Sequence, residues 1–176
     1  MDYFEFYELP RQFDLDEKAL KRKYLQMSKR FHPDFHSLSS IEEQEEALEK
    51  STLNNKAYKV LKAFDSRLRY ILELHGLLQE GQNTTLPQAF LMEMMEINES
   101  IMELQFDFDA QVYQTILDEL QAFEKKLKEN IEQATQAYDL AQNKDNQLLE
   151  PVLDYHYKRK YLVRIKENLK KIEKTA

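Results

Sequence analysis

The sequence predicts an all-α protein made of two helical domains. Only 2 of its 176 residues are glycine and 4 are proline, whereas 42% are hydrophobic and 32% are charged. This composition is typical of long helices joined by few turns. Apolar residues recur at steps of three and four along several segments, and a polar stretch without periodicity, Gln79 to Thr85, separates two groups of these segments. We expect an N-terminal helical hairpin in residues 1–76, a linker in residues 77–84 and a C-terminal three-helix bundle in residues 85–176.

Charge and cysteine content exclude several classes of function. The net charge of −7 argues against nucleic acid or an anionic membrane as the main partner. The absence of cysteine excludes disulfides, thiolate zinc sites and a cysteine-ligated iron–sulfur cluster held by this chain alone. No apolar run approaches the length of a membrane span, and the first ten residues are acidic and interrupted, unlike a signal peptide. We therefore expect a cytoplasmic protein without a cofactor.

The first long helix has one apolar and one basic face. A short packed segment, Tyr3 to Leu9, precedes it, and Asp14 or Asp16 can cap its N-terminus. The face that we expect to be buried consists of Leu20, Tyr24, Met27 and Phe31. The basic face, which is typically solvated, consists of Lys18, Lys21, Arg22, Lys29 and Arg30. Because Pro33 has no N–H and disfavours helix at the residue before it, this helix must end close to His32.

A second long helix begins at Ile41 behind a serine-rich loop and carries four glutamates in its first turns. We expect it to pack back on the first helix through Ala47, Leu48, Ala57, Tyr58 and Leu61. The resulting hairpin places His32, Pro33 and Asp34 at its bend, where a loop tip is suited to recognition. A shorter helix, Ser66 to His75, should follow and end at Gly76 as its C-cap.

Three further helices are predicted, from about Thr85 to Leu104, Asp109 to Gln142 and Leu149 to the C-terminus. In the first of these helices, the expected core face consists of Phe90, Met94, Ile97, Ile101 and Leu104. In the second it consists of Val112, Ile116, Leu120, Phe123, Leu127, Ile131, Ala134 and Tyr138. In the third it consists of Leu162, Ile165, Leu169 and Ile172. Five apolar or aromatic side chains fall off these faces: Leu91, Met92, Met95, Tyr157 and Tyr161. Two interpretations are open. These residues are ordinary ones, either scattered on the surface or part of a fully buried helix, or they form an adaptable binding patch.

The sequence gives no sign of enzymatic chemistry. His32, Asp34 and His36 are metal-ligand types in an alternating string, but alternate residues share a side only in an extended strand, which Pro33 and the hairpin oppose. His75 and His156 stand alone, and no phosphate-binding loop or nucleophile motif is present. We expect no catalytic and no metal-binding residues. A metal-dependent hydrolase built on His32, Asp34 and His36 is the enzymatic alternative.

The hairpin resembles a J-domain, the co-chaperone module that stimulates ATP hydrolysis by DnaK-type chaperones. The resemblance lies in the basic helix that ends in Phe31-His32-Pro33-Asp34 and in Leu53-Asn54-Asn55-Lys56-Ala57-Tyr58-Lys59-Val60-Leu61 on the next helix. It implies that the chaperone contacts His32, Pro33 and Asp34, flanked by Lys21, Arg22, Lys29 and Arg30. Leu25-Gln26 stands where many J-domains carry Lys-Arg, and Phe35 where lysine is common. These departures suggest a specialised chaperone.

The segment Leu86-Pro87-x-x-Phe90-Leu91-Met92-Glu93-x-Met95-Glu96 is similar to the signature of the HscB family, J-proteins of iron–sulfur cluster assembly. This resemblance covers nearly the whole chain and implies an L-shaped, two-domain protein of the bacterial type. It implies delivery of a scaffold protein like IscU to a chaperone like HscA. Leu91, Met92, Met95 and Tyr161 would bind the scaffold, and we add Tyr157. The alternative is a J-domain co-chaperone whose bundle binds another client or associates with itself.

Overall fold

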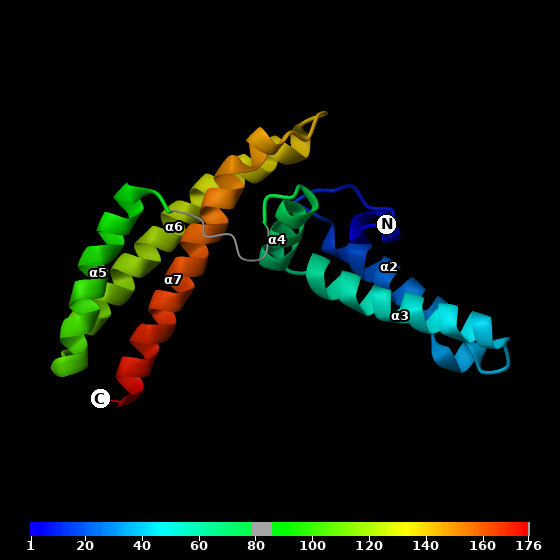
Figure 1. The fold of residues 1–176 in the computed structure, drawn as a ribbon, viewed down its shortest axis with the longest axis horizontal. Helices are drawn as coiled ribbons and strands as arrows, with labels where there is room; N and C mark the ends of the chain where they lie inside the picture. The colour runs from blue at the N-terminus through cyan, green and yellow to red at the C-terminus, as the bar shows by residue number, and fades with distance from the viewer. Residues whose placement is uncertain (79–85, 176) are drawn as a thin grey trace. The chain divides into compact units, whose positions relative to one another are not determined.

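The computed structural model describes residues 1–78 and 86–175, and secondary structure in this part of the chain is helical without strands (Figure 1). The chain divides into two compact units, Met1–Leu78 and Gln79–Ala176. The all-α, two-domain prediction is therefore confirmed, while the L shape stays a prediction. Most of the predicted linker, residues 79–84, lies outside the described residues.

The N-terminal unit is the predicted hairpin with two shorter helices beside it. It contains α1 (Tyr3–Phe6), α2 (Glu17–Arg30), the 3-10 turn η1 (Pro33–His36), α3 (Ile41–Leu61) and α4 (Phe64–Leu74). Asp16 caps α2 by accepting hydrogen bonds from the N–H groups of Lys18 and Ala19. Both bonds lower the pKa of Asp16, and the bond from Ala19 has the larger effect. Ser40 and Glu43 form a capping box at the start of α3.

Two details of this unit differ from the predictions. Leu48 does not pack on α2, because it is 58% exposed. The buried line of α3 runs through Ala47, Asn54, Ala57 and Leu61, and Leu48 lies about 100° around the helix from Ala47. The helix α4 starts at Phe64 rather than Ser66, with the extended backbone of Ala63 before it.

Gly76 ends α4 in the way that its position predicts. Its φ of +69° is left-handed, its N–H donates to the carbonyl of Glu73, and the next N–H, from Leu77, reaches back to Leu72. These two bonds form a Schellman motif, in which a glycine avoids the cost of a positive φ.

The C-terminal unit is a three-helix bundle. It consists of α5 (Gln88–Phe106), α6 (Ala110–Leu140), the 3-10 turn η2 (Asn146–Leu149) and α7 (Glu150–Thr175), and each of the three α-helices packs on the other two (Figure 1). The predicted core faces of α5 and α7 are buried. At the start of α6 the prediction was wrong by one residue, since Val112 is 38% exposed and Tyr113 is buried instead. The Tyr113 hydroxyl donates to Glu173 at 2.9 Å. No helix among the described residues has the length and apolarity to cross a membrane.

Candidate functional site

The first candidate site is the tip, formed by His32, Pro33 and Asp34 between α2 and α3. The helix α2 ends at Arg30, and the N–H of Phe31 still donates to the carbonyl of Met27 at 2.9 Å. His32 then takes an extended backbone, with φ −68° and ψ 128°, as a residue before proline prefers. Pro33 opens η1, where a missing N–H loses no helical bond. Local sequence alone therefore builds the bend.

The side chains of the tip are held in a defined relation and face solvent. The N–H of Asp34 donates to Nδ1 of His32 at 3.3 Å, and the Asp34 carboxylate lies 3.6 Å from the same nitrogen. A neutral His32 ring that accepts at Nδ1 carries its proton on Nε2. The His32 side chain is 53% exposed and that of Asp34 is 85% exposed. The tip thus presents a donor, a rigid ring and a carboxylate to a partner.

His36 does not join His32 and Asp34 in a cluster. Its Nε2 lies 2.9 Å from the carbonyl of Arg30, which ties η1 back to the end of α2. Across residues 1–78 and 86–175, no group of three or more histidine, aspartate or glutamate side chains is arranged to hold a metal ion. In the structure, His32 and His36 each form a hydrogen bond within the bend.

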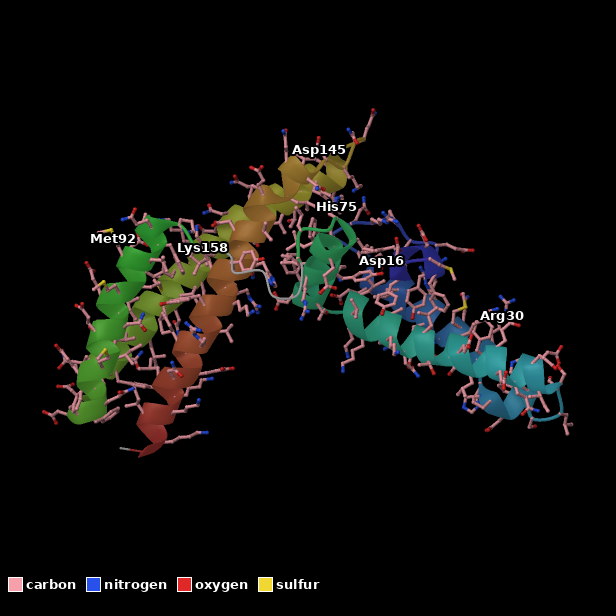
Figure 2. The ribbon with its side chains drawn as sticks, in the orientation of Figure 1. Asp16, Arg30, His75, Met92, Asp145 and Lys158 are labelled. Carbon is pink, nitrogen blue, oxygen red and sulfur yellow. The ribbon has the colours of Figure 1, made fainter. Side chains whose placement is uncertain are left out.

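The predicted basic face of α2 is free to meet an acidic partner. Lys21, Arg22, Lys29 and Arg30 are exposed, and none of them forms an ion pair within the described residues. By contrast, Lys23 on the flank of α2 pairs with Glu8 at 3.0 Å. The guanidinium of Arg30, labelled in Figure 2, lies 5.3 Å from the centre of the Phe31 ring, which keeps one charge beside the tip.

A hollow of about 290 Å³ adjoins the tip, and the sequence analysis did not predict it. Pro33 and His36 form one wall, and Ile41, Gln44, Glu45 and Leu48 of α3 form the other. The exposed Leu48 is part of its lining. Hydrophobic spacing could have indicated this surface, because Ile41 and Leu48 are seven residues apart on one face of α3.

The second candidate site is the α5 patch, formed by Leu91, Met92 and Met95 in the C-terminal unit. These residues are 42%, 63% and 61% exposed, whereas their neighbours Phe90 and Met94 are 5% and 0% exposed. Figure 2 shows Met92 on the side of α5 that faces away from α6 and α7. The three α5 residues predicted to lie off the core face are therefore on the surface, so the interpretation of α5 as a fully buried helix is wrong.

Of the two tyrosines predicted beside this patch, Tyr161 contacts α5. Its ring packs edge-on against Phe90 at 5.7 Å, and its hydroxyl accepts a hydrogen bond from Asn98 at 3.1 Å. Tyr161 is half-buried, so it presents only part of its ring. Tyr157 is also half-buried, and its ring packs on His156 at 5.4 Å. These contacts fix Tyr161 against α5, the helix that carries the patch.

The exposed side of α5 holds further residues that the sequence analysis left out. Met102 is 60% exposed and Phe106 is 88% exposed. All four charged residues of α5 are exposed glutamates, Glu93, Glu96, Glu99 and Glu103, and none forms an ion pair in the described part of the chain. The absence of lysine and arginine between Gln88 and Phe106 was a signal that could have marked this face.

Comparisons with known proteins match both units. Residues 86–170 match the family model described as the HSCB C-terminal oligomerisation domain. The co-chaperone protein HscB homolog of Vibrio parahaemolyticus is 34% identical over 141 residues, which are 74% of this chain and 82% of that protein. The co-chaperone protein HscB of Proteus mirabilis is 30% identical over 175 residues, 98% of this chain and 96% of the relative.

Solved structures agree with these sequence relatives. The crystal structure of human co-chaperone protein HscB has a TM-score of 0.72 and 31% identity, and the match covers 97% of this chain and 81% of the human one. Chaperone HscB from Vibrio cholerae has a TM-score of 0.64 and 27% identity, with 99% of each chain covered. The human sequence relative is named iron-sulfur cluster co-chaperone protein HscB, and it is 34% identical over 82% of this chain and 60% of its own length.

Proposed function

The chain belongs to the HscB family of co-chaperones, and from this premise we propose that it is an adaptor in iron–sulfur cluster assembly. The tip and the basic face of α2 stimulate ATP hydrolysis by a DnaK-type chaperone similar to HscA. The α5 patch and Tyr161, with Tyr157 at the margin, bind a scaffold protein similar to IscU and deliver it to that chaperone. The protein performs no chemistry of its own and acts in the cytoplasm.

The observation that carries this proposal is the presence of two exposed surfaces of different chemistry, one in each compact unit. The tip is polar and stands beside cations without ion pairs in the described residues. The α5 patch is apolar and stands beside carboxylates that also lack ion pairs there. The surfaces share no residue, so a partner at one surface leaves the residues of the other unused, which is what an adaptor needs.

The chemistry of each surface suits its proposed partner. Exposed cations speed the encounter with an acidic surface and orient it, so that the tip can make its close contacts. At the α5 patch, burying three or four apolar side chains gives a gross gain of about 1.5–3 kcal/mol for each of them. After the costs of association, a weak to moderate complex remains. Such a complex suits a scaffold that must be handed on.

The proposal is tested by measuring ATP hydrolysis by the chaperone with this protein, in the presence and absence of scaffold. The full-length chain should accelerate hydrolysis, most strongly with scaffold present. His32→Gln and Asp34→Asn should each reduce the rate to that of the chaperone alone and leave scaffold binding unchanged. Glu49→Gln, which removes an exposed charge elsewhere on α3, is the control and should stimulate normally. Full stimulation by the two tip variants would refute the assignment of the tip.

Scaffold binding is tested separately by calorimetry with the triple variant Leu91→Ala/Met92→Ala/Met95→Ala. Because exposed anchors of an interface account for much of its affinity, binding should weaken about 100-fold. The control is Leu140→Ala/Val163→Ala, which removes exposed apolar side chains from α6 and α7. Unchanged affinity in a folded triple variant would show that the scaffold does not bind through the α5 patch, and no binding to the unmodified chain would show that the bundle has another client.

A further inference from the structure

We propose that the scaffold-binding surface of α5 extends beyond the α5 patch through Met102 to Phe106, at the end of the helix. Met102 and Phe106 would contact the same scaffold protein as Leu91, Met92 and Met95. This extension rests on the proposed function, because it takes the partner of the α5 patch as given. It extends the contact surface to the C-terminal end of α5.

Helical geometry places these residues in one stripe. Met95, Met102 and Phe106 are seven and four residues apart, so at about 100° per residue they lie within about 40° of one another around α5. From Met92 to Phe106 the stripe is about 21 Å long, at about 1.5 Å per residue. The α5 patch alone spans about 6 Å. The extension therefore changes how much of a partner α5 can cover.

Exposure separates this stripe from ordinary surface residues. Single exposed apolar side chains are common and need no explanation. Here, however, Met102 is 60% exposed and Phe106 is 88% exposed, and both share a helical face with Met95, which is 61% exposed. The opposite face of the same helix is buried in the core, where Ile101 is 5% exposed and Leu104 is 2% exposed. A row of exposed apolar side chains along one face of a helix marks an interaction surface.

The charges beside the stripe favour the scaffold over a second copy of this chain. The matching family model is described as an oligomerisation domain, so a second copy is the competing occupant. The exposed charges of α5 are all carboxylates, and Glu99 lies inside the stripe between Met95 and Met102. In a two-fold dimer built on this stripe, carboxylates would face carboxylates, which is unfavourable. The stripe fits a partner that combines apolar side chains with lysine or arginine.

The methionine methyl groups give a direct test. The chain has six methionines, and Met94 is fully buried. We label the methyl groups with ¹³C and add the parent organism's purified scaffold protein without cluster. The Met92, Met95 and Met102 signals should shift or broaden together, and that of Met94 should not. If Met102 does not respond while Met92 and Met95 do, the extension is wrong and the proposed function stands. If none of the three responds, the proposed function fails with it.

A variant tests how much the extension contributes. Met102→Ala/Phe106→Ala should weaken scaffold binding at least tenfold and leave the stimulation of the chaperone without scaffold unchanged. The control Leu140→Ala/Val163→Ala should bind like the unmodified chain. Equal affinity of the variant and the unmodified chain would overturn the extension. So would methyl shifts that depend on the concentration of this protein alone, because they would identify a second copy as the occupant.

Discussion

The hydroxyl of Tyr7 lies 2.6 Å from Oδ1 of Asn54, and this buried contact ties the N-terminal segment to the middle of α3. The amide nitrogen of Asn54 donates in turn to the carbonyl of Tyr24 at 3.2 Å and to Oγ of Ser28 at 2.9 Å, both on α2. One side chain, 1% exposed, therefore links three segments. It holds together the hairpin that carries the tip.

Replacing Asn54 should destabilise the N-terminal unit. Asn54→Ala leaves the buried Tyr7 hydroxyl without its side-chain partner, and we expect the free energy of unfolding to fall by about 2–3 kcal/mol. The neighbouring Asn55 is the matched control, since it is exposed and its Oδ1 accepts an exposed hydrogen bond from the Tyr24 hydroxyl, at 3.1 Å. Asn55→Ala should change stability by less than about 0.5 kcal/mol. Urea unfolding measures both variants. Equal losses in the free energy of unfolding would show that the buried bonds of Asn54 contribute no more than the exposed bond of Asn55.

The pH dependence of stability should report the burial of Tyr7. Burial, helped by the neighbouring Tyr24 and Tyr58, raises the pKa of Tyr7 well above its usual value of 10. Above pH 10 the unfolded chain loses this proton and the folded chain keeps it, so the contribution to stability is full below pH 10 and declines as the pH rises. Tyr7→Phe should remove up to about 1.4 kcal/mol per pH unit from that decline. Parallel urea unfolding series of both proteins between pH 9 and 11 measure it, and identical slopes would contradict the prediction.

Two adjacent methionines on α5 should behave oppositely. Met94 is 0% exposed in the bundle core, so Met94→Ala should lower the free energy of unfolding by about 2–4 kcal/mol through the cavity that it leaves. Met95 is 61% exposed, and Met95→Ala should change it by less than about 0.5 kcal/mol. Urea unfolding followed by circular dichroism measures both. A large loss of stability in Met95→Ala would mean that the α5 patch belongs to the core.

Hydrophobic spacing predicted the helical faces that pack on a partner helix from the same unit. Every member of the α5 core face, from Phe90 to Leu104, is buried, because a step of three or four returns to the same side of a helix. The method failed where two apolar neighbours compete for one position. Val112 and Tyr113 are such a pair, and only the contacts of Tyr113 with Phe108 and Glu173 decide which one turns inward.

The buried polar residues could not be predicted from the sequence, because their partners come from distant segments. Arg67 is 5% exposed on α4, and its Nε donates to the carbonyl of Phe13 at 2.8 Å. Nothing near Arg67 in the sequence distinguishes it from the exposed Arg69. The tip was predictable for the opposite reason, since Pro33 determines its bend locally. The extent of the α5 surface needed the exposures of Met102 and Phe106.

The basic face of α2 should control how fast the chaperone binds rather than how it is activated. Lys29 and Arg30 flank the tip and lack ion pairs in the described residues, so Lys29→Gln/Arg30→Gln should lower the association rate constant about three- to tenfold at low salt. The effect should shrink above about 0.5 M salt, because exposed charges are then screened within a few ångströms. Stopped-flow measurements over a salt series test this. Lys18→Gln is the control, since Lys18 is exposed on the same face, eleven residues or about 16 Å before Lys29. If Lys18→Gln slows association as much as the double variant, charge anywhere on α2 is sufficient and the flank of the tip has no special role.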